Sequence, residues 1–299
     1  MLSDSIYQEE HIPTQFERFW RSFRANNLAM FGLWSLLFIA LVTILSPWIA
    51  PYDPQMHSSV LLLPPSWEPE GTVDYFLGTD DLGRDILSRL IDGSLFSIGA
   101  AVLITLIATL VGGTIGALAG MTKGLLSSTL NHILDTVMSI PSLLLAIIFV
   151  AFLGAGEFNI LLAIGLALIP RFIRSVYVAV HNEVEKDYVM AARLDGANEF
   201  YLLWHSIFPN ILPIIVAEIT MALSIAILDI TALGFLGLGA QSPSTEWGAM
   251  LGDSVELIYI APWTVTLPGL AIMFTVVVIN LVGDGARQAS MRESNNAVT

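Results

Sequence analysis

Long apolar runs alternate with short polar stretches along most of the chain. Four of these runs contain no Asp, Glu, Lys or Arg, namely residues 25–52, 94–122, 136–156 and 257–283. Two more, 158–180 and 211–237, carry two ionisable residues each. About 20 helical residues cross a hydrocarbon core that is about 30 Å thick, and every run reaches that length. The pattern therefore predicts an all-α integral membrane protein with six transmembrane helices.

The first run could instead be a cleaved signal peptide. However, residues 1–24 precede it and are mostly polar, and the run is longer than the apolar region of a signal peptide. We therefore expect a retained helix. Composition agrees with a membrane protein, because 55% of the residues are hydrophobic and only 13% are charged.

The basic residues favour one orientation, because Lys and Arg close to membrane segments collect on the cytoplasmic side. With six spans and the N-terminus inside, only Arg84 and Arg89 of the 12 basic residues fall outside. The inside set is Arg18, Arg21, Arg24, Lys123, Arg171, Arg174, Lys186, Arg193, Arg287 and Arg292. We therefore expect a multi-pass protein with both termini in the cytoplasm. Its layout is a cytoplasmic segment at 1–24, the first span at 25–52, an outside loop at 53–93, a core at 94–283 with spans two to six and a cytoplasmic loop at 181–210, and a cytoplasmic tail at 284–299.

Proline in the loop at 53–93 and glycine in the second span each predict a local feature of the backbone. Five prolines should keep the start of this region extended, namely Pro51, Pro54, Pro64, Pro65 and Pro69. The spacing from Asp85 to Asp92 is that of a short amphipathic helix leading into the second span. In that span Gly112, Gly116 and Gly120 recur every four residues, which lets another helix approach closely.

The cytoplasmic loop at 181–210 is too polar to cross a membrane and too periodic for a linker. It predicts two short helices with Gly196 ending the first. Their apolar faces are Val180, Val184, Tyr188 and Ala191 on the first helix, and Phe200, Leu203, Trp204, Ile207 and Phe208 on the second. Exposed apolar side chains rimmed by charge indicate a protein partner. The alternative is a helix in the lipid interface, which the acidic residues of the loop disfavour.

Two carboxylates interrupt the fifth span. Glu218 and Asp229 project from one helix face at 100° per residue. Ionisable residues inside a span usually face the bundle interior or a water-filled path, so both are candidates for a translocation path. The alternative is that each is satisfied by a neighbouring group such as Thr220, Thr231 or Arg171. Asp135, near the cytoplasmic end of the third span, is either a path residue or a solvated end charge.

Enzyme chemistry finds little support. The two lysines, Lys123 and Lys186, do not follow a glycine, so no P-loop GK[ST] can be written. There is no GxSxG sequence and no cysteine, and the 5 histidines lack the spacing of a metal site. We expect no catalytic residue, no bound metal and no nucleic-acid partner.

The cytoplasmic loop resembles the conserved loop of binding-protein-dependent ABC transporter permeases. That loop reads EAA, three residues, Gly, nine residues, then a hydrophobic pair ending in Leu-Pro. Met190-Ala191-Ala192, Gly196 and Pro209 fall at those spacings, with Met190 in place of Glu and Phe208 in place of Leu. The resemblance implies that residues 187–204 form a coupling helix, which docks into a groove on a cytoplasmic ATPase. The residues implied in ATPase coupling are Asp187, Met190, Ala191, Ala192, Gly196, Ala197 and Pro209.

The resemblance extends over nearly the whole chain. Sequences similar to those of the second permease of the dipeptide and oligopeptide group are LGTDDLGRD (77–85), LGFLGLGAQ (233–241), EWGAML (246–251) and NLVGDG (280–285). Within that group LLPPSW and HILDT resemble the Sap-type permease, which is associated with antimicrobial peptides and putrescine. The resemblance implies a MetI-like ABC permease fold in the bacterial inner membrane, with no cofactor bound by this chain. It also implies a second homologous permease, two ATPase subunits that use ATP, and a periplasmic solute-binding protein.

The outside loops carry a net charge of −10, since their acids face only two arginines. The acids are Asp53, Glu68, Glu70, Asp74, Asp80, Asp81, Asp85, Asp92, Glu157, Glu246, Asp253 and Glu256. An acidic vestibule concentrates cations, which favours cationic peptides or polyamines such as putrescine as substrates. Two alternatives stay open: a secondary transporter or channel that uses Glu218 and Asp229, and a membrane-bound interaction protein.

Overall fold

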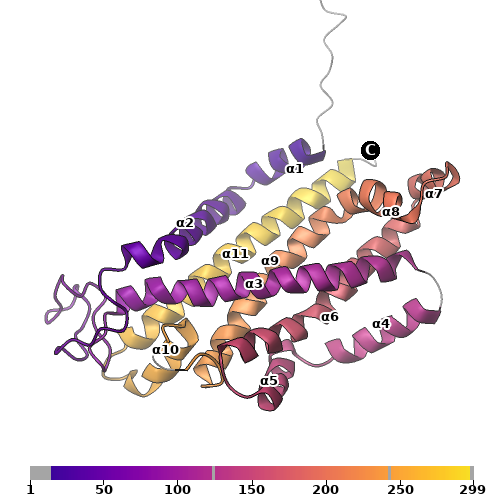
Figure 1. Ribbon diagram of the computed structural model, residues 1–299. Coiled ribbons are helices and arrows are strands. Elements are labelled where there is room, and N and C mark those ends of the chain that lie inside the picture. The colour runs from indigo at the N-terminus through magenta and orange to yellow at the C-terminus, as the bar shows by residue number, and fades with distance from the viewer. Residues whose placement is uncertain (1–14, 123–124, 242–243, 297–299) are drawn as a thin grey trace, which may run out of the picture.

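The structure is a computed structural model that describes residues 15–122, 125–241 and 244–296. Lys123 and parts of the predicted terminal segments lie outside these residues. The described part of the chain is all-helical and contains no strand. Five helices are long and apolar enough to cross a membrane, and they run side by side in one bundle (Figure 1). They are α2 (Asn27–Ile49), α3 (Ile86–Met121), α6 (Glu157–Val184), α9 (Phe208–Phe235) with the short turns before it, and α11 (Trp263–Asn296).

The third predicted span, 136–156, is not a straight helix. It consists of α4 (Leu125–Met138) and α5 (Ser142–Leu153), which meet at a bend of 88°. Pro141 lies at the break. Proline has no N–H to donate and disfavours a helical conformation for the residue before it, so the helix ends ahead of it. Counted as one span, the bent pair brings the total to six, the predicted number.

Close packing of α3 against α6 forms the centre of the bundle. A Cβ placed on Gly112 would lie 2.6 Å from Phe172 Cβ, and one on Gly116 would lie 2.6 Å from the carbonyl oxygen of Ile173. Only glycine allows this approach, so the spacing of these glycines is confirmed as a helix-packing feature. Buried apolar side chains such as Ile104 and Ile227 fill the space between α3, α6 and α9.

One end of the bundle carries residues 50–85 and α10 (Trp247–Ser254) (Figure 1). Here the predicted short helix from Asp85 to Asp92 is not separate, because α3 begins at Ile86 and continues to Met121. Asp85 caps this helix: its Oδ2 accepts hydrogen bonds from the backbone N–H of Ser88 at 2.8 Å and from the Ser88 hydroxyl at 2.6 Å. The second span is therefore longer than the apolar run at 94–122.

The other end gathers α1 (Gln15–Arg24), α7 (Asp187–Leu194), α8 (Glu199–Tyr201) and the last turns of α11 (Figure 1). Phe23 of α1 is buried in a small apolar cluster with Ala286 and Ala289 of α11. The first and last described helices therefore meet at the end of the bundle that holds α7.

Candidate functional site

The loop between α6 and α9 begins with a well-defined helix end. α7 ends at Leu194, and Gly196 has a φ of +91°, a left-handed conformation that favours glycine. The N–H of Gly196 donates to Arg193 O and that of Ala197 donates to Ala192 O, both at 3.1 Å. This hydrogen-bond pair is the Schellman motif. The predicted role of Gly196 as the end of the first helix is confirmed.

The second predicted helix of the loop is continuous with the fifth span. α8 leads into a π-helical turn, Leu202–Ile207, which leads directly into α9. At this join the N–H of Phe208 donates to Leu203 O, five residues earlier. Pro209 lies in the first turn of α9, directly after the π-helical turn, where a residue without an N–H is tolerated.

The surface formed by α7, α8 and the π-helical turn, here called the coupling surface, is apolar and exposed. Its most exposed large apolar residues are Leu194, at 82% of its surface, and Phe200, at 72%. The opposite side is anchored, because Val189, Leu202 and Ile207 are completely buried. Among the predicted coupling residues, Ala192 and Ala197 are half-buried; the exposed ones are Asp187, Met190, Ala191, Gly196 and Pro209.

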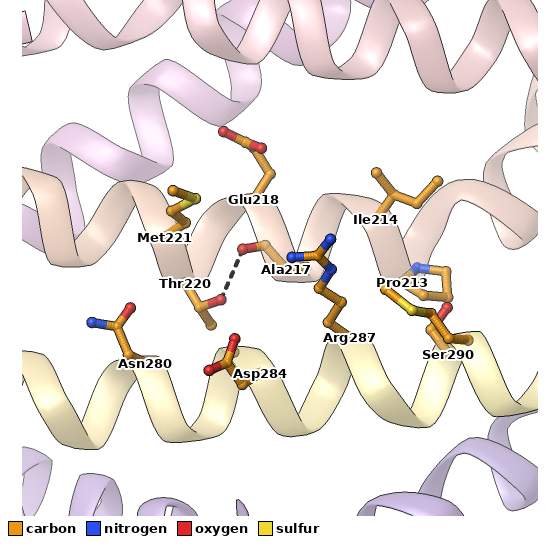
Figure 2. A pocket seen from close by; sticks show the side chains of 12 residues that line it. Pro213, Ile214, Ala217, Glu218, Thr220, Met221, Asn280, Asp284, Arg287 and Ser290 are labelled. Carbon is orange, nitrogen blue, oxygen red and sulfur yellow. Dashed lines mark hydrogen bonds between the residues drawn. The ribbon is translucent and has the colours of Figure 1, made fainter. Parts of the chain in front are cut away.

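Glu218 is paired inside the bundle. The Nε of Arg171, on α6, donates to Glu218 Oε1, and the guanidinium also contacts the sulfur of Met221. Thr220 does not form a hydrogen bond with Glu218. Its hydroxyl donates instead to the backbone oxygen of Ala217, one turn earlier in α9, at 2.9 Å (Figure 2). Among the neighbours that could satisfy this half-buried acid, Arg171 is the one paired with it in the structure.

Glu218 also lines a cavity of about 550 Å³ between α9 and α11. Figure 2 shows Asn280, Asp284 and Arg287 projecting from α11 toward α9. Sequence reasoning missed these three residues: Arg287 served only to orient the chain, and the other two were only letters of the NLVGDG motif. Their separations of three and four residues place them on one helix face, which was a usable signal.

Asp229 does not share this cavity. Its side chain is 6% exposed and lies beside the hydroxyl of Ser142, at the start of α5. Its Oδ2 accepts no hydrogen bond from any described residue. Thr231 does not help it, because that hydroxyl donates to Ile227 O at 2.9 Å. The two acids of α9 are therefore held in different surroundings.

Asp135 lies on α4 with its side chain 56% exposed. Its Oδ1 is 3.5 Å from Nη2 of Arg174, on α6. This exposure favours a solvated end charge over a path residue.

Two acids of the loops predicted to lie outside, Asp80 and Glu246, are buried and have structural partners. Asp80 is buried with both outside arginines: Arg84 Nε donates to Asp80 Oδ2 at 2.7 Å, and Arg89 contacts the same oxygen. Glu246 is also fully buried and caps α10, accepting from the N–H groups of Gly248 and Ala249 at 2.7 Å each. Burial raises the pKa of Glu246, and these two hydrogen bonds oppose the shift.

The side chains that remain exposed in the loops predicted to lie outside give this surface an acidic character. Both outside arginines are buried, together with Asp80, Asp85 and Glu246. The exposed outside acids are Asp53, Glu68, Glu70, Asp74, Asp81, Glu157, Asp253 and Glu256. Within the described residues, no three His, Cys, Asp or Glu side chains are grouped so as to hold a metal ion.

Comparison with known proteins identifies strong similarities. Residues 112–292 match the family of binding-protein-dependent transport system inner membrane components, and residues 14–65 match the N-terminal TM domain of oligopeptide transport permease C. The chain is 57% identical to the peptide transport system permease protein SapC of Salmonella typhimurium, over 97% of this chain and 98% of that protein. It is 46% identical to the dipeptide transport system permease protein DppC of Escherichia coli K12, over 92% of each.

A solved structure shares the fold. The inward-facing MetNI methionine ABC transporter contains a chain that superposes with a TM-score of 0.55, covering 68% of this chain and 96% of that one. Because the two sequences are only 20% identical, this likeness concerns the arrangement of helices alone.

Proposed function

The chain belongs to the family of binding-protein-dependent transport system inner membrane components, and from this premise we propose that it supplies half of the translocation path in an ATP-driven peptide transporter. It is a permease subunit and not an enzyme, since its relatives are permeases of ABC transporters, whose ATP is hydrolysed by separate subunits. The peptide class comes from the names of its relatives, which transport peptides and dipeptides.

The observation that carries this proposal is the coupling surface. Leu194, Phe200 and Trp204 expose large apolar side chains at the end of the bundle, while α7 is anchored by buried residues beneath it. A contiguous exposed apolar patch of this kind marks a site of interaction with a partner. A groove on an ATPase subunit is the partner we propose, with Asp187, Met190, Ala191, Ala192, Gly196, Ala197 and Pro209 at or near the contact.

The assembly that follows has two permease chains and two ATPase subunits in the bacterial inner membrane. In it both termini of this chain and the coupling surface face the cytoplasm, and a periplasmic solute-binding protein delivers the substrate. Closure of the ATPases on ATP moves α7 and shifts the helices between outward-open and inward-open arrangements. The cavity beside Glu218 is proposed to line the path, and Asp229 is a second candidate deeper in the bundle.

Cationic peptides, or polyamines such as putrescine, are the proposed substrates. The support is electrostatic: the acids on the outer surface are exposed, while both outside arginines are buried against Asp80. Such a surface raises the local concentration of cations and repels anions.

Purification and transport together test the proposal. Tagged chain extracted from its own membranes should bring with it a P-loop ATPase and a second permease, and the absence of any ATPase would refute the ABC assignment. The assembled complex in proteoliposomes should move a cationic peptide or putrescine faster than a neutral peptide of equal length. Equal rates for all three would contradict the cationic preference only.

A further inference from the structure

A compact hydrogen-bond cluster joins four elements of the chain, namely the end of α6, α7, the π-helical turn and the start of α9. It contains Glu183 near the end of α6, Tyr188 on α7, Ser206 in the π-helical turn and Asn210 on α9. The Tyr188 hydroxyl donates to Glu183 Oε1 and accepts from Asn210 Nδ2 at 2.9 Å. Asn210 Nδ2 also donates to Ser206 O at 2.7 Å, and that oxygen lies 3.2 Å from the Tyr188 hydroxyl. One hydroxyl therefore meets three other parts of the loop.

The carboxylate in this cluster is well held. Glu183 is 7% exposed, and its second oxygen, Oε2, pairs with Lys186 Nζ at 2.8 Å. A buried carboxylate needs donors, and the Tyr188 hydroxyl supplies one. Desolvation of the hydroxyl, followed by its hydrogen bond to Glu183, raises the pKa of Tyr188. The phenol thus keeps its proton and its role as donor.

α7 depends on such contacts for its orientation. It has 8 residues, fewer than the roughly 12 at which an isolated helix becomes even marginally stable. Val189 is its one fully buried residue, and an apolar contact of this kind does not fix how the helix is rotated. The hydrogen bonds of Tyr188 have direction, so they fix the rotation that the apolar contact leaves open.

We infer that the Tyr188 hydroxyl is a positioning group that fixes the orientation of α7 against the start of α9, so that a movement of α7 reaches α9 as well as α6. This inference rests on the proposed function only for its consequence, which is the transfer of ATPase closure to the spans. The contact itself depends on nothing but the geometry of the loop.

The test uses Tyr188→Phe, which removes the hydroxyl and keeps the ring. Tyr201→Phe is the matched control, because Tyr201 lies in the same loop, stacks on His205 with ring centroids 4.4 Å apart, and makes no hydroxyl hydrogen bond to a described residue. Both variants are made in the complete complex, and their assembly and ATP hydrolysis are measured first. Amide hydrogen exchange is then followed by mass spectrometry.

In Tyr188→Phe the amides of 187–194 should exchange about two- to tenfold faster, the loss expected for one such hydrogen bond, while those of α10 stay unchanged. The amount of peptide moved per ATP hydrolysed should fall by a similar factor. Tyr201→Phe, which removes no hydrogen bond to Glu183, should leave the exchange of residues 187–194 unchanged.

Unchanged hydrogen exchange of residues 187–194 in Tyr188→Phe overturns the inference. Equally faster exchange of these residues in Tyr201→Phe also overturns it. Faster exchange with unchanged transport per ATP supports the positioning role of the hydroxyl and instead contradicts the coupling role that the proposed function gives to α7.

Discussion

At the scale of single residues, Glu218 and Asp80 are each paired with arginine, whereas Oδ2 of the buried Asp229 has no hydrogen-bond partner among the described residues. Glu218 on α9 forms an ion pair with Arg171 on α6, and Asp80 forms ion pairs with both Arg84 and Arg89. Burying an ion is costly unless an opposite charge and hydrogen bonds accompany it, so these pairs hold specific helices in register. Their effects can be measured one side chain at a time.

The pair between Arg171 and Glu218 predicts an asymmetric response to mutation. Arg171→Gln leaves Glu218 unpaired and should lower stability by about 1–3 kcal/mol, a value kept modest because the two side chains remain 28% and 15% exposed. Removing both charges, in Arg171→Gln with Glu218→Gln, should restore part of the loss. The thermal midpoint of the purified complex measures this, and a double variant less stable than Arg171→Gln would contradict it.

Glu246 predicts a dependence of stability on pH. Burial raises its pKa in the folded chain, so the folded carboxyl holds its proton more tightly than the unfolded one. Its contribution to stability is therefore largest below the unfolded pKa and declines as pH rises through the interval up to the folded pKa. The thermal midpoint of the native chain minus that of Glu246→Gln should be larger at about pH 4 than at about pH 7. Equal differences at the two pH values would contradict a raised pKa of Glu246.

At the scale of elements, glycine determines where helices approach and where α7 ends, and Pro141 marks the break between α4 and α5. Other prolines, namely Pro47, Pro170, Pro213 and Pro268, lie inside continuous helices. Glycine brings α3 onto α6, ends α7 through a left-handed residue, and lets α10 pack against α9, where a Cβ on Gly248 would lie 2.0 Å from Thr231 O. Pro141 separates α4 from α5, and Pro209 lies in the first turn of α9, after the π-helical turn. The apolar surface of each helix supplies the driving force, and these residues supply the geometry.

Two glycines of α3, three residues apart, predict opposite outcomes. Gly116→Ala would place a Cβ 2.6 Å from Ile173 O and should cost about 1–3 kcal/mol by overpacking. Gly113→Ala meets nothing within 4 Å and should be neutral or slightly stabilising, because alanine is the better helix former. Unfolding of the two variants in the same detergent compares them, and equal destabilisation would contradict the observed α3–α6 contact.

Gly196 tests the end of α7. Nothing lies within 4 Å of a Cβ at this position, so Gly196→Ala should act through its positive φ alone, at a cost of about 1–2 kcal/mol. Gly196→Asn should cost less, because asparagine tolerates the left-handed conformation. Transport per ATP hydrolysed is the measurement, and we expect the order native, Asn, Ala. An alanine variant that couples as well as the native complex would exclude a role for this helix end.

At the scale of the whole molecule, the spans could be predicted from sequence because each is a long apolar run. The bend of the third span was readable from Pro141 but was not predicted, since the run at 136–156 is uninterrupted in hydropathy. The cavity residues Asn280, Asp284 and Arg287 could not be assigned, because their meeting with α9 depends on how two helices are rotated against each other. Pairing of Glu218 with Arg171 was only one of several alternatives for the same reason.

The proposed orientation of the molecule can be tested directly, because the chain contains no cysteine. Cysteines placed singly at the exposed positions Val73 and Ala25 lie at opposite ends of the bundle, and neither belongs to the coupling surface. A membrane-impermeant thiol reagent added to intact spheroplasts should label the first and should reach the second only after lysis. Labelling of Ala25→Cys in intact spheroplasts would reverse the proposed topology.

The close contact of α3 with α6 has a mechanical consequence. Two helices whose backbones are in contact at successive turns cannot slide past each other independently. α3 and α6 therefore tilt together as one rigid body. α3 has 36 residues, so it is about 54 Å long at 1.5 Å per residue. A tilt of about 5° at the α7 end displaces the far end by about 5 Å. The cap at Asp85 and the outer loop that it anchors travel with that far end.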